Sequence, residues 1–275
     1  MKIVLVMLYN LQPYIEDNIK QLKSHNNNDI VIITDNKFDN FFKGLNVTII
    51  NIEKLIPEYL NIISNINNTF RNGFWKLTSY RFLAIYEYMK KYNINNIVHV
   101  ENDVLIYTNI DSVKFHSTNK LLLTMDSKNR CIPGIMYIPN YIILKRCIDS
   151  FNPNLNDMQN FSLCFYKYTN YIDSLPIFIE NNDNDISKMI TANYKYYNAI
   201  FDAAAIGQYL GGIDPRNKEG DTTGFINETC IFNYSKYNFT WKNINNKKIP
   251  FLIIENQEIP IINLHIHSKD LKKFI

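Results

Sequence analysis

Residues 2–9 read KIVLVMLY, and residues 29–35 read DIVIITD. Both segments are almost unbroken apolar runs, which is typical of strands covered on both faces in a parallel sheet. Between them, apolar residues at helical spacing predict a helix over 16–23. A strand, a helix and a second buried strand in this order indicate a βαβ unit.

The same alternation continues along the chain. Strands are expected at 47–52, 96–103, 121–125, 135–138 and 259–267, and helices at 55–66, 74–91, 140–151, 158–168 and 201–210, with a loop over 126–134. The sequence therefore predicts an α/β fold with a Rossmann-like, mainly parallel sheet flanked by helices and ligands at the carboxyl ends of its strands. No internal repeat or Pro/Gly/Ser linker is present, so one compound domain is expected over 1–275.

Composition narrows the function classes. The 275 residues include 29 Lys and Arg against 26 Asp and Glu, a net charge of +3, which argues against an electrostatically driven nucleic-acid binder. No apolar run approaches the roughly 18 residues of a membrane-spanning helix, so no membrane span is expected. The four Cys show no CxxC spacing, which favours a reducing, cytoplasmic setting.

Two carboxylates follow the strand predicted at 96–103. The segment reads NIVHVEND, and at a strand's period of two Glu101 and Asp103 point to the same side. Adjacent carboxylates repel unless a cation or a proton lies between them. A divalent ion can be held by one or two carboxylates when phosphates and waters supply the other oxygens. The alternative is an ordinary turn with solvated acids.

The end of the chain carries two histidines and a lysine in LHIHSK, residues 264–269. His265 and His267 lie two apart on a predicted strand and hence on one face, and Lys269 follows. Imidazole can complete a metal shell begun by carboxylates, and an ammonium can offset diphosphate charge. The alternative is a pair of partly exposed histidines without a role.

Other polar residues stand at predicted element ends. Tyr9 and Asn10 end the first strand and Asp35 ends the second, where a base or ribose would lie in this architecture. Asp126 ends a later strand. Asp202 opens the helix predicted at 201–210, either as its N-cap or as a group that orients substrate or acts as a general base.

Several of these segments resemble one enzyme family. Glu101-Asn102-Asp103 looks like a Glu-x-Asp variant of the Asp-x-Asp motif of nucleotide-sugar glycosyltransferases of the GT-A fold. Residues 78–82 (TSYRF) resemble a helix motif of retaining transferases that extend bacterial lipooligosaccharides, in which the Arg contacts the donor. Residues 132–137 (IPGIMY), 202–205 (DAAA) and 264–269 resemble three further segments in the same order, with departures at Pro133 and Ala203. The composition, rich in Ile and Asn, suits the AT-rich giant DNA viruses whose glycosyltransferases the chain resembles most.

The resemblance implies a metal-dependent transferase that moves a sugar from a nucleoside diphosphate, with UDP expected, to a glycan, protein-linked or other hydroxyl acceptor. Residues 1–110 would form the nucleotide-binding half, and 111–275 the acceptor half with a returning tail. Mn²⁺ or Mg²⁺ would be held by Asp103, Glu101, His265 and His267, and Asp202 would be catalytic. The donor would contact Tyr9, Asn10, Asp35, Arg81, Glu101, Gly134 and Lys269.

Two alternatives stay open. One is an inactive nucleotide- or glycan-binding module of the same fold. The other is a nucleotidyltransferase, which is disfavoured because no Gly-rich phosphate loop follows the first strand. The tail has few large apolar residues after Ile266, namely Leu271, Phe274 and Ile275, so we expect it to be mobile until metal and nucleotide bind.

Overall fold

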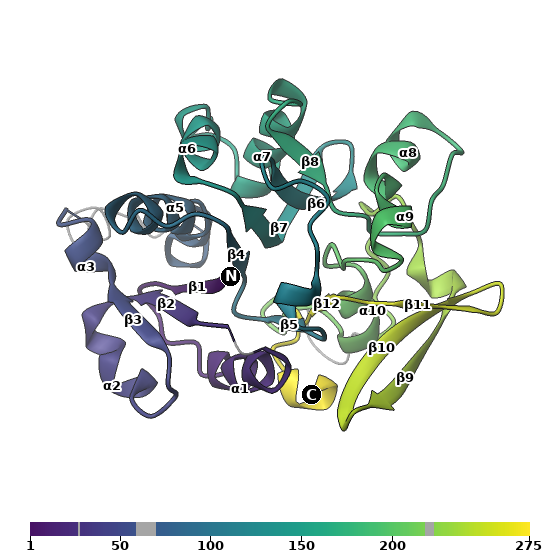
Figure 1. The fold of residues 1–275 in the computed structure, drawn as a ribbon, viewed down its shortest axis with the longest axis horizontal. Helices are drawn as coiled ribbons and strands as arrows, with labels where there is room; N and C mark the ends of the chain where they lie inside the picture. Colours follow the sequence, from purple (N-terminus) through teal and green to yellow (C-terminus); the bar gives the residue numbers. More distant parts are fainter. Residues whose placement is uncertain (27, 59–69, 218–222) are drawn as a thin grey trace.

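A seven-stranded sheet forms the centre of the computed structural model, which describes residues 1–26, 28–58, 70–217 and 223–275 (Figure 1). Its strand order is β3-β2-β1-β4-β7-β6-β8. The strands are β1 (Lys2–Met7), β2 (Ile30–Thr34), β3 (Thr48–Asn51), β4 (Ile97–Val100), β6 (Leu121–Ser127), β7 (Arg130–Ile138) and β8 (Ile172–Ser174). β1 pairs in parallel with β2 and β4, β2 with β3 and β6 with β8, whereas β7 is antiparallel to both neighbours. The predicted mainly parallel sheet is confirmed.

Helices cover both faces of this sheet. The helices of the described residues are α1 (Ile15–His25), α2 (Asp39–Phe42), α3 (Ile52–Leu55), α5 (Phe70–Lys91), α6 (Tyr141–Asp149), α7 (Asp157–Lys167), α8 (Asp185–Thr191), α9 (Tyr194–Tyr197) and α10 (Ile206–Gly211). Figure 1 shows α5, α6 and α7 on one face and α1 on the other. The expected α/β class with flanking helices is therefore also confirmed, while the division into halves at residue 110 stays a prediction.

The apolar run of β1 shows why the sheet is covered twice. Val4 and Val6 belong to the apolar cluster on the α5 side, whereas Ile3 and Leu5 belong to the cluster on the α1 side. Alternate residues of a strand point to opposite faces, so a strand buried on both faces must be apolar throughout. The continuous run in the sequence is the direct consequence.

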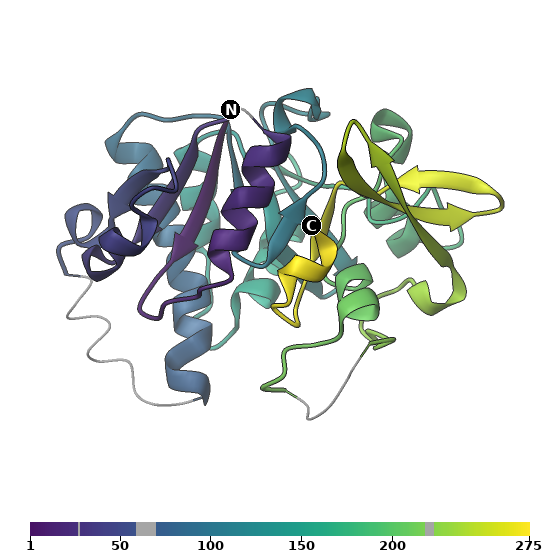
Figure 2. The same cartoon turned by 90° about the horizontal axis from the view of Figure 1, so that it is seen from below.

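Two smaller sheets complete the fold. β9 (Asn238–Ile244), β10 (Lys247–Ile254) and β11 (Gln257–Pro260) form an antiparallel sheet. β5 (Val104–Ile106) pairs antiparallel with β12 (Asn263–His265), so the end of the chain returns to the segment that follows β4. Both views show β12 beside β5 in the middle of the molecule (Figures 1 and 2).

Some predicted elements are wrong. The loop expected over 126–134 is instead part of a β6–β7 hairpin, because its residues continue the two apolar strands up to a two-residue turn. The helix expected over 201–210 begins only at Ile206, and the strand expected over 259–267 is interrupted between β11 and β12. The helix predicted at 55–66 lies largely outside the described residues, although α3 ends at Leu55.

Among the described residues, no helix combines the length and the hydrophobicity that crossing a bilayer requires.

The expectation that burial contributes little to holding the C-terminal tail is wrong. Ile266, Leu271 and Phe274 are buried, and the short helix η4 (Leu271–Phe274) packs near α1 (Figure 2). The Tyr107 hydroxyl donates a 3.0 Å hydrogen bond to the Phe274 carbonyl. The apolar side chains of the tail are few, but all except Ile275 enter the core.

Phe274→Ala is expected to lower the free energy of unfolding by about 3 kcal/mol, because it leaves a cavity in place of a buried ring. Ile275→Ala, at an adjacent side chain that is 47% exposed, should change it by less than about 0.5 kcal/mol. Urea denaturation of both variants measures the difference. Equal stabilities would show that the tail does not contribute to the core in solution.

Candidate functional site

The turn after β4 carries the two predicted carboxylates. β4 ends at Val100, so the strand predicted over 96–103 is too long: Glu101 and Asp103 lie in a turn, where the strand period of two does not apply. The turn is fixed instead by amides: Asn18 Nδ2 donates to the carbonyls of Glu101, Asn102 and Val104, and Asn102 Nδ2 donates to the Val6 carbonyl and to Gln12 Oε1. These bonds hold the carboxylates at the carboxyl end of β4.

Pairing of β12 with β5 brings His265 to this turn. His265 is the register partner of Val104, and the Ile266 amide donates to the Asp103 carbonyl at 2.8 Å. Gly134 on β7 lies on the other side, because the Glu101 amide donates to its carbonyl. A Cβ on Gly134 would lie 2.9 Å from His265 Nδ1, so only glycine leaves room for this ring.

Three donor atoms converge in this space. His265 Nε2 lies 3.0 Å from Glu101 Oε2 and 3.3 Å from Asp103 Oδ1. One ligand atom from each side chain lies within 4.8 Å of the others, which is compatible with a shared metal ion. Adjacent ligands of an octahedral ion with bonds of roughly 2.1 Å lie about 3 Å apart. The spacing of these three atoms suits such an ion.

The outer oxygens of the two carboxylates face fixed cations. Glu101 Oε1 pairs with Arg81, and Asp103 Oδ2 pairs with Lys269. Arg81 is buried and is also held by Asp157 Oδ2 at 2.9 Å. The inner oxygens therefore point at His265 while the outer oxygens are occupied by guanidinium and ammonium groups.

Charge and burial set the protonation of the cluster. Burial opposes ionisation of Glu101 and Asp103, but Arg81 and His265 lower the pKa of Glu101, and Lys269 and His265 lower that of Asp103, so both are carboxylates. Burial alone would lower the pKa of His265, yet the Asp103 and Glu101 charges raise it to about 10. In the metal-free protein an imidazolium therefore holds the two carboxylates together.

His267 lies behind His265 rather than in the donor group. The ring centroids of His265 and His267 are 4.4 Å apart, and His267 Nδ1 is 2.8 Å from Gln208 Nε2 of α10. Burial and the neighbouring His265 and Lys269 charges lower the pKa of His267 to about 3, which keeps it neutral. A role for His267 as a metal ligand stays a prediction.

Asp202 connects α10 to β12. Its Oδ1 accepts from the Ala205 and Ile206 amides, and its Oδ2 accepts from the Gly207 and His265 amides, at 2.8–2.9 Å. The carboxylate is buried and carries four hydrogen bonds from backbone donors. These contacts cap α10 and position His265, while the predicted catalytic role stays untested.

Tyr9, Asn10 and Asp35 form a second group, at the ends of β1 and β2. The Tyr9 amide donates to Asp35 Oδ2 at 2.6 Å, with Tyr9 at a φ of 69°. The side chains of Tyr9 and Asn10 are exposed, so they are accessible to a ligand. Their predicted contact with a nucleotide stays a prediction, although they lie at the same edge of the sheet as the carboxylate turn.

Asp157 and Tyr14 are site residues that the sequence reasoning missed. Asp157 is the first residue of α7 and accepts from Thr78 Oγ1 at 3.3 Å as well as from Arg81. The Tyr14 ring centroid lies 5.7 Å from Lys269 Nζ. An Asp in a first helical turn has an ordinary explanation in the helix dipole, so nothing in the sequence distinguishes Asp157. TSYRF could have prompted a search for a buried acid to pair with Arg81.

The residues present fit a divalent cation. Two carboxylate oxygens and an imidazole nitrogen form a donor set that suits Mn²⁺. Arg81 and Lys269 pair with the other carboxylate oxygens, so Glu101 Oε2 and Asp103 Oδ1 are available to an ion. The ion would take the position between Glu101, Asp103 and His265.

Binding of Mn²⁺ is expected to strengthen as pH rises, because a coordinating His265 must lose its proton. The pKa of His265 is raised from about 6.5 to about 10, so its contribution to the stability of the metal-free fold is complete below pH 6.5 and is lost as pH rises through 10. At pH 7.5 each bound Mn²⁺ should release about one proton. Calorimetric titration in two buffers of different ionisation enthalpy measures this release, and equal heats in both would contradict it.

No protein-family model matches the chain, and no curated protein sequence matches it. Solved structures align with it at low similarity. Mouse xyloside xylosyltransferase 1 aligns over 64% of this chain and 86% of its own, with 10% identity and a TM-score of 0.44. A glycosyltransferase involved in the glycosylation of the major capsid of PBCV-1 aligns over 63% and 80%, with 10% identity and a TM-score of 0.39. A cytidylyltransferase from Leptospira borgpetersenii aligns over 72% and 83%, with 12% identity and a TM-score of 0.39. At these values the alignments carry no argument about function.

Proposed function

We propose that the chain is a metal-dependent glycosyltransferase of the GT-A type, which moves a sugar from a nucleoside diphosphate to a hydroxyl acceptor. The nucleoside diphosphate that we propose is UDP. The observation that carries the proposal is the convergence of Glu101 Oε2, Asp103 Oδ1 and His265 Nε2 between the cations Arg81 and Lys269. This combination would stabilise a diphosphate leaving group, whose negative charge grows as the bond to the sugar breaks.

A divalent ion held by Glu101, Asp103 and His265 would neutralise charge on the diphosphate. Lys269 lies beside Asp103 and would add an ammonium for the phosphate oxygens. In the transfer, the acceptor oxygen forms a bond to the anomeric carbon, and the bond from that carbon to the diphosphate breaks. The diphosphate leaves with the electron pair, and one of its oxygens takes the proton of the acceptor hydroxyl.

Arg81 and Asp157 would orient the donor. Asp157 and Glu101 hold the guanidinium from two sides, so its direction is fixed before a ligand arrives. Burial raises the pKa of Asp157, and the Arg81 charge opposes that rise. An Arg that is ordered in advance loses little entropy on binding a sugar or phosphate oxygen.

A second candidate is a module that binds nucleotide or glycan without turnover. One observation favours it: the carboxylate of Asp202, the predicted catalytic residue, is already occupied by four backbone N–H groups. In the transferase, Asp202 would instead act by positioning His265.

Release of UDP from UDP-glucose, UDP-galactose, UDP-N-acetylglucosamine and UDP-xylose tests the proposal. With Mn²⁺ we expect release from at least one donor, and EDTA should abolish it. Thermal stabilisation by UDP and Mn²⁺ together, without release from any donor, would favour the module. Neither release nor stabilisation would contradict both candidates.

A further inference from the structure

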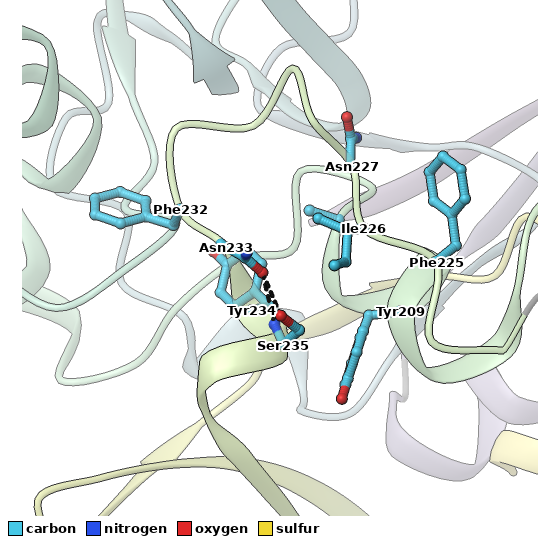
Figure 3. Close-up of a pocket in the computed structure, with 9 residues that line it drawn as sticks. Tyr209, Phe225, Ile226, Asn227, Phe232, Asn233, Tyr234 and Ser235 are labelled. Atoms are coloured by element: carbon cyan, nitrogen blue, oxygen red, sulfur yellow. Dashed lines mark hydrogen bonds between the residues drawn. The ribbon is translucent and has the colours of Figure 1, made fainter.

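Two cavities differ sharply in what they can hold. The first lies beside α10, between Tyr209, Phe225, Ile226 and the segment 232–235, where the Ser235 amide and hydroxyl donate to Asn233 Oδ1 (Figure 3). Its volume of about 10 Å³ has room for one water at most. The second is an open pocket of about 280 Å³. That volume is near the lower end of the roughly 300–1,000 Å³ typical of small-molecule sites, so it suits one small ligand.

Three separate segments line the open pocket. They are the β6–β7 turn with Ser127, Asn129 and Arg130, the start of α7 with Asn156, Met158 and Gln159, and Thr229 from a later loop. All these side chains except Met158 carry hydroxyl, amide or guanidinium groups. A pocket that offers many hydrogen-bonding groups and one apolar contact suits a polyhydroxylated ring.

The capping of α7 decides which amide groups remain for a ligand. Asn156 Oδ1 accepts from the Gln159 amide at 2.9 Å, and Gln159 Oε1 accepts from the Asn156 amide at 3.3 Å. Both side-chain carbonyls are therefore used, which leaves the two NH₂ groups as donors. Sugar hydroxyl oxygens are acceptors that match them.

The pocket carries little net charge. Among the described residues that line it, Arg130 is the one that carries a charge, and its guanidinium lies 3.2 Å from the buried carboxylate of Asp126. Thr229 Oγ1 donates to the same Asp126 oxygen, and Asn227 Oδ1 accepts from Arg130. Because the Arg130 charge is already paired, the described residues that line the pocket offer no free cation to a carboxylate on the ligand.

Neighbouring residues connect the pocket to the group formed by Glu101, Asp103 and His265. Asn156 and Met158 flank Asp157, which holds Arg81, and Arg81 in turn pairs with Glu101. The β6–β7 turn belongs to the same hairpin as Gly134, which adjoins His265. The pocket is thus linked to the group of Glu101, Asp103 and His265 through Asp157 and Arg81, the cation that pairs with Glu101.

We propose that this pocket binds the terminal sugar of the acceptor, and that this sugar is a neutral monosaccharide unit rather than a uronic acid. That the bound sugar is the acceptor rests on the proposed function, but binding of a neutral sugar in this pocket can be tested without turnover.

Saturation-transfer NMR with methyl β-galactoside, methyl β-glucoside and methyl β-glucuronide, in the presence of Mn²⁺ and UDP, is the test. Asn129→Trp places a large ring in the pocket from an exposed turn position. Lys128→Trp is the matched control, since Lys128 is the other residue of the same turn and does not line the pocket. Thermal stabilisation by Mn²⁺ and UDP is measured in parallel and reports on the metal site alone.

We expect at least one neutral glycoside to bind the native chain and the Lys128→Trp variant, with a Kd about tenfold higher in Asn129→Trp. The glucuronide should bind more weakly than its neutral counterpart. Unchanged binding in Asn129→Trp, tighter binding of the glucuronide, or no neutral glycoside bound would each overturn the inference. Glycoside binding without thermal stabilisation by Mn²⁺ and UDP would support a sugar site in this pocket and contradict the transferase.

Discussion

Asp103→Asn is expected to abolish Mn²⁺ binding and to lower metal-dependent turnover by about 100-fold or more, the loss seen when a group that stabilises transition-state charge is removed. Asp103 supplies one of the three converging donor atoms and also faces Lys269. An amide in its place carries no charge, so Lys269 loses its carboxylate partner and His265 loses one of the two carboxylates that face it. Mn²⁺ titration and UDP release measure the two effects.

Asp173→Asn is the matched control. The Asp173 carboxylate also lies near a His and a Lys, with His116 Nε2 at 3.5 Å and Lys120 Nζ at 3.2 Å. It lies on β8, and it is not part of the converging donor group. The control should lower stability slightly and leave Mn²⁺ affinity unchanged. A similar loss of Mn²⁺ affinity in both variants would show that the effect of Asp103→Asn is not specific to the cluster.

Gly207→Ala is expected to have the largest effect on stability, more than about 3 kcal/mol, and to displace His265 from the cluster. An added Cβ would lie 2.1 Å from the His265 carbonyl oxygen and 3.0 Å from Asp202 Oδ2. Both neighbours are rigid: one is backbone and the other carries four hydrogen bonds. α10 and β12 must therefore separate.

Gly211→Ala, one helical turn further along α10, separates this effect from that of helix propensity. Its Cβ would approach the Phe274 ring at 3.1 Å, and a side chain can shift where a backbone cannot. Alanine also favours a helix by up to about 1 kcal/mol over glycine. We expect Gly211→Ala to lie within about 1 kcal/mol of the native chain in urea denaturation. Equal losses in the two variants would contradict the close approach at Gly207.

Local pattern was sufficient for the parallel half of the sheet. β1 and β2 are apolar throughout because both their faces are covered, so their runs in the sequence are unambiguous. The return of His265 to Glu101 and Asp103 was also predicted. A site that needs all three residues can form only if the C-terminal segment folds back to the turn after β4.

Other features depend on contacts that no local pattern contains. Asn18 shapes the carboxylate turn through bonds to carbonyls more than 80 positions away, and its amide looks like any other in an Asn-rich chain. The tail is held by Phe274 and Leu271, whose burial depends on α1 and Tyr107 rather than on the composition of the tail. The number of apolar residues in a short segment therefore does not predict how firmly that segment is packed against the rest of the fold.

The most direct test of the account is the depletion of free Mn²⁺, followed by electron paramagnetic resonance, when the chain is added with and without UDP. We predict that the native chain and Asp173→Asn bind one Mn²⁺ each, more tightly with UDP, and that Asp103→Asn and His265→Gln show no saturable binding. Mn²⁺ binding of equal affinity in all four proteins, or none in the native chain with UDP, would contradict a metal centre at Glu101, Asp103 and His265.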